Sequence, residues 1–195
     1  MHKIAVLASG KGSIFRAMLI SDAPVFLLLT DRECDAESIA RLHGIPIERI
    51  QRQQYDNDSA YSAAVAAVLT GHNITISAMS GFMQVLDPYY FASFKGITLN
   101  THPSLLPSFP GAHAVKDALA HGVKVTGCTI HIANEVLDGG PILDQRPVYV
   151  RPDDTVETLH ERIKSVERIA YPELLLKLIA GELEVPEAYR SRLIG

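Results

Sequence analysis

The stretch KIAVLASGKGSIFRAMLIS, residues 3–21, decides the fold class of this 195-residue chain. Its first part, Lys3–Ala8, is an apolar run without alternation, which is typical of a strand buried on both faces. The glycine-containing turn SGKGS (9–13) follows, and Ile14–Ser21 continues with the spacing of a helix. A buried strand that passes through a tight turn into a helix predicts a strand–helix–strand unit.

The same alternation of elements continues along the chain. Further strands are predicted at 24–30, 74–79, 96–101, 125–133 and 147–150, and helices at 35–43, 58–69, 112–121 and 155–179, the last with Asp153 or Asp154 as its N-cap. Up to about residue 110 this order indicates a parallel sheet with helices on both faces, and the later strands could be antiparallel additions. We expect an α/β, doubly wound, mostly parallel sheet in a single domain over residues 1–195.

Composition and charge exclude several classes of protein. The chain is 47% hydrophobic and 21% charged, with a net charge of −4, which argues against non-specific nucleic-acid binding. Cys34 and Cys128 lie far apart and are expected to be free thiols. The first apolar stretch is too short for a signal peptide or a membrane span, so we expect a cytoplasmic protein without membrane partners.

The turn SGKGS (9–13) has two interpretations. Glycines allow a backbone to approach a ligand closely, and a helix N-terminus favours phosphate, to which Lys11 could add a charge. However, the turn matches neither the dinucleotide fingerprint nor the P-loop pattern. It is either a plain strand–helix turn or a phosphate site for something other than a dinucleotide.

A second polar motif lies in LNTHPSLLPSFPG, residues 99–111. Residues i and i+2 of a strand face the same side, so Asn100 and His102 point together at the end of a strand that Pro103 terminates. Open α/β sheets bind ligands at this end of their strands. An amide donor beside a titratable imidazole suits stabilising an oxyanion and moving a proton.

Asp138, in the loop sequence LDGGP (137–141), is the best carboxylate partner for His102, although it could equally be a turn-forming residue. The motif lacks a nearby nucleophile of the serine or cysteine elbow type. This indicates direct attack by a substrate nucleophile on a carbonyl. Six further histidines show no metal-ligand spacing, so we expect no metal and a surface or core position for most of them; these six are His43, His72, His113, His121, His131 and His160.

Together these motifs resemble the folate-dependent formyltransferase family. The resemblance rests on NTHPSLLP (100–107), VTGCTIH (125–131) and LDGGPI (137–142), and extends to VLASGKGS (6–13), SGFMQVL (80–86), HERIK (160–164) and ERIAYP (167–172). It implies transfer of a formyl group from 10-formyltetrahydrofolate to the amine of phosphoribosylglycinamide, in purine biosynthesis. It also implies a doubly wound, mostly parallel sheet, as the alternation of elements does.

The resemblance further implies roles for individual residues. Asn100 and His102 would hold the oxyanion, with His102 as general acid, and Asp138 would keep His102 protonated and help to pass the proton through water. The folate would contact Phe82, Met83, Gln84, Val85, Leu86, Asn100, Asn134, Glu135, Val136, Leu137 and Asp138. The phosphate would lie on Gly12, Ser13 and Ile14, and the rest of the ribonucleotide on Glu167, Arg168, Ile169 and Ala170, while the Leu106–Pro107 bond could be cis.

Three places depart from the family pattern. Ile14 stands where the family usually has Asn, and Asp58 where it tends to have Arg, while the usual Met-Arg-Ile-Leu here reads Met83-Gln84-Val85-Leu86. Arg52 or Lys11 could compensate for the charge reversal at Asp58. These changes leave open a formyltransferase that acts on another small amine, such as an amino sugar or an amino acid derivative.

Three other classes of protein remain as alternatives, and a feature of the sequence disfavours each of them. A hydrolase of formyltetrahydrofolate usually carries an additional N-terminal domain, whereas a strand is expected here from Lys3. A transfer RNA formyltransferase would need an additional C-terminal domain and more positive charge. A non-catalytic binding module would have no need of Asn100, His102 and Asp138 together. We expect small-molecule substrates and a monomer or homodimer.

Overall fold

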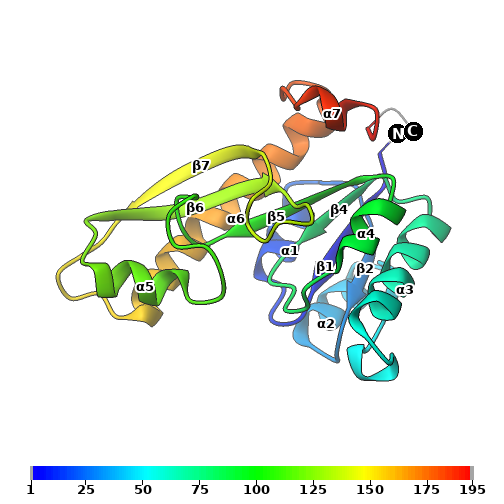
Figure 1. Ribbon diagram of the computed structural model, residues 1–195, viewed down its shortest axis with the longest axis horizontal. Helices are drawn as coiled ribbons and strands as arrows, with labels where there is room; N and C mark the ends of the chain where they lie inside the picture. The colour runs from blue at the N-terminus through cyan, green and yellow to red at the C-terminus, as the bar shows by residue number, and fades with distance from the viewer. Residues whose placement is uncertain (1, 194–195) are drawn as a thin grey trace.

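The computed structural model describes residues 2–193 and contains one seven-stranded sheet in the order β3-β2-β1-β4-β5-β6-β7 (Figure 1). Every pair from β3 to β5 is parallel, and β6 and β7 are added in antiparallel fashion. The expected mostly parallel, doubly wound sheet is therefore confirmed. The strands are β1 (Ile4–Ala8), β2 (Val25–Thr30), β3 (Ile47–Arg49), β4 (Ile76–Met79), β5 (Ile97–His102), β6 (Val125–Ile132) and β7 (Ile142–Tyr149).

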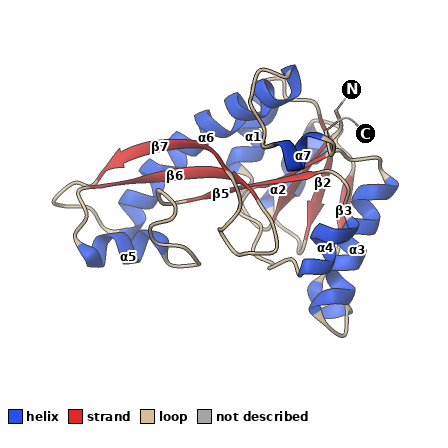
Figure 2. Cartoon of the chain, turned by 45° about the horizontal axis from the view of Figure 1, so that its top comes forward, coloured by secondary structure: helices blue, strands red, loops and turns tan. Residues whose placement is uncertain are grey.

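Helices cover both faces of the sheet (Figure 2). They are α1 (Ser13–Ile20), α2 (Asp35–Leu42), α3 (Asp58–Gly71), α4 (Pro88–Ser93), α5 (Ala114–His121), α6 (Val156–Ala180) and α7 (Glu187–Arg190), with a short 3-10 turn at Arg52–Gln54. No helix within residues 2–193 has the length and apolar composition needed to cross a membrane.

The two faces of β1 explain why its sequence does not alternate. Ile4, Val6 and Ala8 pack into a core with α1, α2 and α6, whereas Ala5 and Leu7 pack into a second core with α3 and α4. Both faces are fully buried, so each position of the strand must be apolar. A third, smaller apolar cluster lies between α5, α6 and the antiparallel strands β6 and β7.

The sheet order reverses between β1 and β4. From β1 the chain proceeds outward through α1 to β2, while β4 lies on the opposite side of β1. The loops after these two strands, residues 9–12 and 80–87, therefore leave the carboxyl edge in different directions. An open α/β sheet binds its ligands at the crevice that such a reversal creates.

Several elements differ from those expected from the sequence. The short elements β3, α4 and α7 were not predicted, and β7 begins at Ile142, five residues before the predicted 147–150 strand. β7 is an edge strand whose first half is largely solvent-accessible, so it lacks a buried apolar run. The N-cap of α6 is Thr155, which forms a reciprocal capping pair with Thr158, so the predictions of Asp153 and Asp154 were wrong.

Beside the parallel half of the sheet, the buried carboxylate of Glu37 joins α2 to strands β2 and β3. It accepts hydrogen bonds from Thr30 on β2, from Arg49 on β3 in a bidentate pair, and from Arg41 one turn along α2. The hydrogen bond from Arg49 is the main reason that the pKa of Glu37 lies below its usual value, against the opposing effect of burial. The ionised carboxylate is thus the form that the folded state favours.

Replacing Glu37 should make stability less dependent on pH. Glu37→Gln should lower the free energy of unfolding by about 2 kcal/mol at pH 7, because charged hydrogen bonds are lost at a buried site. Since the folded-state pKa is depressed, this advantage exists above the unfolded pKa and disappears as pH falls through the folded pKa. Urea unfolding of both proteins between pH 7 and about pH 3 measures the difference in their free energies of unfolding. This difference should become smaller as the pH falls. A constant difference would contradict this role.

Candidate active site

The pairing of β5 with β6 brings the polar residues of the two strands together. In this antiparallel pair Asn100 lies opposite His131, and His102 lies opposite Thr129. Asn100 and His102 share one face of β5 at its carboxyl end, as the sequence predicts. The site therefore begins where the sheet changes from parallel to antiparallel.

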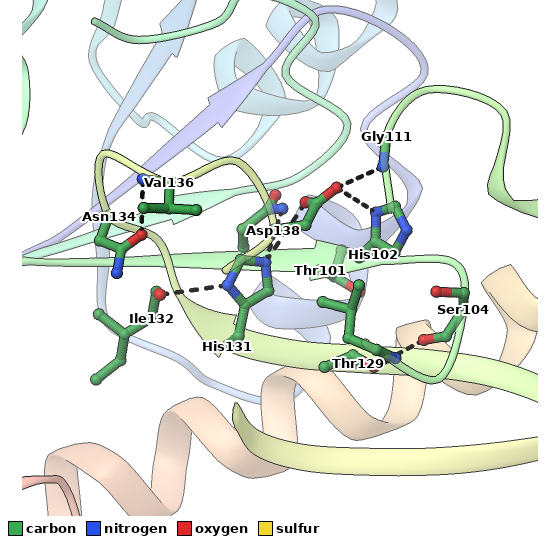
Figure 3. A network of polar contacts seen from close by, with 12 residues as sticks. Thr101, His102, Ser104, Gly111, Thr129, His131, Ile132, Asn134, Val136 and Asp138 are labelled. Carbon is green, nitrogen blue, oxygen red and sulfur yellow. Dashed lines mark hydrogen bonds and ion pairs between the residues drawn. The ribbon is translucent and has the colours of Figure 1, made fainter. Parts of the chain in front are cut away.

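Asp138 places its carboxylate between the two histidines (Figure 3). Its Oδ2 lies 3.4 Å from Nδ1 of His102, and its Oδ1 lies 3.9 Å from Nε2 of His131. The same Oδ2 accepts a hydrogen bond from the backbone N–H of Gly111 at 2.8 Å. Because the Asp138 side chain is only 5% exposed, its charge acts on these neighbours with little screening by water. The structure thus brings Asn100, His102 and Asp138 into one cluster.

His131 fixes the orientation of Asn100. Its Nδ1 lies 3.2 Å from the carbonyl oxygen of Ile132, which can only accept, so Nδ1 carries the proton. Burial lowers the pKa of His131. The hydrogen bond to Ile132 and the charge of Asp138 act in the opposite direction but are weaker, so the ring is neutral. Its unprotonated Nε2 then accepts from Nδ2 of Asn100 at 3.2 Å, which leaves one amide N–H of Asn100 for a ligand.

The sequence did not reveal this role, because His131 was grouped with the histidines expected in the core or on the surface. It is indeed buried, but its function depends on the register between β5 and β6. The one available signal is a histidine at the end of the apolar strand VTGCTIHI, where a polar side chain must find a partner.

His102 is held at both ring nitrogens. Nε2 lies 2.8 Å from the carbonyl oxygen of Phe109, so this nitrogen donates, while Nδ1 faces Asp138. A protonated His102 would therefore direct its second N–H at the carboxylate. The ring is 5% exposed, and this pair can carry a proton away from bulk water.

The proline-rich loop after β5 is fastened to β6 by Thr129. The Thr129 hydroxyl donates to the carbonyl oxygen of Ser104 at 2.7 Å and accepts from the N–H of Leu106 at 3.0 Å. The Leu106–Pro107 bond is cis, as the family resemblance implied. This loop supplies the Phe109 and Gly111 backbone groups that hold His102 and Asp138.

The loop that carries Asp138 approaches β6 so closely that it requires a glycine at position 140. A Cβ at Gly140 would lie 1.7 Å from the carbonyl oxygen of Ile132, so no side chain fits there. Asp138 itself has a φ of +53°, a left-handed conformation that aspartate tolerates better than most residues. The LDGG sequence thus serves to press the Asp138 loop against the strand that carries His131.

A cavity of about 180 Å³ opens beside this cluster. All eleven residues predicted to contact the folate line it, and Met79, Phe91, His131 and Ala133 complete the lining. Its rim is apolar on both sides, because Met83 and Val85 on one loop and Val136 and Leu137 on the other are largely exposed. His102 is not part of the lining and lies beyond Asp138 (Figure 3).

The predicted phosphate turn has the backbone of an anion site, but one of its side chains is not available. Gly12 is the N-cap of α1 with φ +67°, and a Cβ there would lie 2.8 Å from Cβ of Ala36. The first N–H groups of α1 lack intrahelical partners, which suits an anion. The Ile14 side chain is 6% exposed and belongs to the core with α1, α2 and α6, so only its backbone can face a ligand.

Of the four residues predicted on α6, only Glu167 reaches β5. It is buried and accepts a hydrogen bond from the Thr101 hydroxyl at 2.9 Å, between Asn100 and His102 in sequence. Burial raises the pKa of Glu167, against the effect of this bond. Arg168 is half-buried, Ile169 is 61% exposed, and Ala170 is buried in the core.

Neither cysteine is placed for catalysis. Both are free thiols, as predicted from their spacing. Burial raises the pKa of Cys128 to about 12, which leaves it protonated and unreactive. Within the described residues 2–193, no three His, Cys, Asp or Glu side chains form a group that could hold a metal ion.

Comparison with known proteins gives the family. Residues 2–175 match the formyl transferase family model. A phosphoribosylglycinamide formyltransferase of Mycobacterium tuberculosis is 45% identical over 171 residues, which cover 85% of this chain and 80% of that protein. One from Bacillus subtilis is 36% identical over 187 residues, or 92% and 95% of the two chains.

The chain belongs to the formyl transferase family. Its structure also superposes on that of glycinamide ribonucleotide transformylase 1 from Symbiobacterium toebii, with a TM-score of 0.91 at 35% identity, over 96% of this chain and 92% of that one. The family resemblance inferred from the motifs is therefore confirmed.

Two departures from the family's usual residues alter local charge. Asp58 lies 2.6 Å from Nε of Arg52, so Arg52 is paired rather than available to replace a missing cation. Gln84 donates to Oδ2 of Asp31 at 2.7 Å, which turns its side chain toward the protein. The side chains of Asp58 and Gln84 are thus both bonded to other residues of this chain.

Restoring the family's asparagine at position 14 should damage the fold. Ile14→Asn would place an amide in the apolar core, and we expect the free energy of unfolding to fall by about 2 kcal/mol. Urea unfolding at neutral pH measures this, with Ile20→Asn on an exposed position of the same helix as the matched control. If Ile14→Asn is as stable as the control, the side chain can turn outward and serve a ligand.

Proposed function

We propose that this chain transfers the formyl group of 10-formyltetrahydrofolate to the amine of phosphoribosylglycinamide, in purine biosynthesis. The observation that carries the proposal is the cluster of Asn100, His102 and Asp138 at the edge of a cavity with an apolar rim. Relatives that match most of the chain bear the name of this activity. We also propose that residues 1–195 act as one domain, on small-molecule substrates, in the cytoplasm.

Asn100 is the group best placed to stabilise the oxyanion. Attack of the amine on the formyl carbon places negative charge on the formyl oxygen, and a fixed N–H donor in a water-poor site stabilises that charge. One N–H of Asn100 is committed to His131, and the other is free to donate toward the cavity. Since His131 holds the amide in this orientation before substrate binds, little reorganisation is needed during the reaction.

Asp138, with His102 behind it, carries the proton. In the overall transfer, the attacking amine loses one proton, the bond between the formyl carbon and N10 of the folate breaks, and N10 gains one proton. Asp138 lines the cavity and faces Nδ1 of His102, so the carboxylate can accept the amine proton and pass it through water to the leaving nitrogen, while His102 stabilises the changing charge of Asp138 from behind. No covalent enzyme intermediate is needed.

The ligands would occupy opposite sides of this cluster. The cavity residues 82–86 and 134–138 would bind the folate, partly through backbone groups, and the backbone of Gly12, Ser13 and Ile14 would bind the phosphate. Glu167, held by Thr101 beside the catalytic strand, would bind the ribonucleotide between them.

A second acceptor has one observation in its favour. The burial of Ile14 leaves the phosphate turn without a polar side chain at that position, and an acceptor without phosphate would not need one. An amino sugar or an amino acid derivative is therefore the alternative substrate class.

The direct test is formyl transfer from 10-formyltetrahydrofolate, with the folate product followed by absorbance and the formylated acceptor identified by mass spectrometry. We expect turnover that requires phosphoribosylglycinamide. Release of formate without any acceptor would instead indicate a hydrolase. Folate binding without turnover on phosphoribosylglycinamide, but with turnover on an amino sugar, would favour the alternative substrate class.

Asp138→Asn should abolish most of the activity without unfolding the protein. The amide keeps the size of the side chain but cannot accept a proton, so we expect kcat to fall by about a thousandfold, within the usual range for loss of a general acid–base group. Steady-state kinetics and thermal unfolding of the purified variant measure both effects. Asp144→Asn, which removes a carboxylate on the edge strand β7, is the matched control. A kcat within tenfold of the unchanged protein would exclude Asp138 from the proton path.

A further inference from the structure

Thr101 lies between two catalytic residues in the sequence, but its side chain faces the other side of the sheet. Asn100 and His102 share one face of β5. Because successive residues of a strand alternate between faces, Thr101 points with Leu99 toward the face that α6 covers. There its hydroxyl donates to Oε1 of Glu167, on α6, at 2.9 Å. This one side chain thus connects the catalytic end of β5 to the helix.

The carboxylate of Glu167 has few partners for a buried group. The residue is 4% exposed, and burial raises its pKa. The hydrogen bond from Thr101 is the strongest of the effects that oppose this rise, ahead of the charges of Lys164 and Arg168. An ionised carboxylate can accept about four hydrogen bonds. Within the described residues 2–193, however, the Thr101 hydroxyl is the one donor bonded to it, so Oε2 can accept from a ligand.

The position of α6 does not depend on this bond. Tyr171, one turn further along α6, donates its hydroxyl to the carbonyl oxygen of Leu99 at 3.0 Å, and both residues are fully buried. Four residues of a helix rise about 6 Å and two residues of a strand about 6.6 Å, so the two helix-to-strand bonds match in spacing. The Tyr171 bond and the apolar packing around it hold the helix, which leaves the Thr101 bond to hold the carboxylate.

We propose that Thr101 is a positioning residue that orients the carboxylate of Glu167, so that Oε2 accepts a hydrogen bond from a donor group of the ribonucleotide. A freely rotating side chain loses conformational entropy when a ligand fixes it, whereas a carboxylate already held at Oε1 loses less. Thr101 acts only through Glu167 and does not itself contact a substrate. The inference rests on the proposed function, which supplies the ribonucleotide and the role of Glu167 in binding it.

Steady-state kinetics of formyl transfer separate positioning from catalysis. Thr101→Val keeps the shape of the side chain and removes the hydroxyl. We expect it to raise the KM for phosphoribosylglycinamide about tenfold, as for the loss of one hydrogen bond to a charged group. The kcat and the KM for 10-formyltetrahydrofolate should change by no more than about twofold, because Asn100 and His102 lie on the opposite face of β5.

Three further variants test whether the effect passes through the hydroxyl and the carboxylate. Thr101→Ser keeps the hydroxyl and should retain the original KM. Thr126→Val is the matched control, because it removes a buried threonine hydroxyl on the neighbouring strand β6 that has no hydrogen-bond partner, and it should leave the KM unchanged. Glu167→Ala should raise the KM by itself, and adding Thr101→Val to it should raise the KM no further.

Several outcomes would overturn the inference while leaving the proposed function intact. One is a KM for phosphoribosylglycinamide within about twofold of the original in folded Thr101→Val. Others are an equal rise in Thr126→Val, a parallel fall in kcat, or additive effects of Thr101→Val and Glu167→Ala. If Thr101→Val does not fold, the same rise is required of Thr101→Ala, which removes the hydroxyl from a smaller side chain. Absence of turnover on phosphoribosylglycinamide by the unchanged protein would overturn the proposed function together with the inference.

Discussion

The antiparallel pairing of β5 with β6 is the constraint on which the site depends. A parallel strand beside β5 would send the chain away from the carboxyl edge through another crossover helix. Because β6 instead runs back along β5, it sets His131 against Asn100 and Thr129 against His102. The following loop then returns to place Asp138 between the two histidines. A single change of strand direction thus assembles these five polar groups beside the cavity.

The charges in this cluster are arranged so that each group has one role. His131 is neutral because it is buried and because its Nδ1 proton is committed to a backbone carbonyl. It can therefore orient Asn100 without taking part in proton transfer. His102 has a carboxylate at one ring nitrogen and a carbonyl oxygen at the other, so both of its ring nitrogens face hydrogen-bond acceptors. The difference between the two histidines lies in their partners, not in their exposure.

The sequence was informative wherever a property is local. Unbroken apolar runs located the buried parallel strands, and the i, i+2 spacing of Asn100 and His102 placed them on one face. The sequence was uninformative where the position of an element or the role of a residue depends on contacts with distant parts of the chain. The first half of β7 is an accessible edge strand without an apolar pattern, and the importance of His131 depends on cross-strand register.

The predicted phosphate turn, residues 9–13, also shows what the sequence could and could not predict. The glycines of SGKGS predicted a tight strand–helix connection, and Gly12 has the left-handed backbone that only glycine adopts without cost. The sequence alone could not tell that the side chain of Ile14 packs into the core behind this turn. Residue type marks Ile14 only as a departure from the family pattern, whereas the structure shows its side chain packed in the core.

Neutral His131 turns Asn100 so that an amide N–H faces the cavity. Nitrogen NMR of the protein with labelled histidine tests this arrangement most directly, with the resonances of His131 assigned by comparison with His131→Gln. At pH 7 we expect a neutral ring with its proton on Nδ1 and a bare Nε2. A proton on Nε2, or a charged ring at this pH, would contradict it, because Asn100 would then have to present its oxygen to His131.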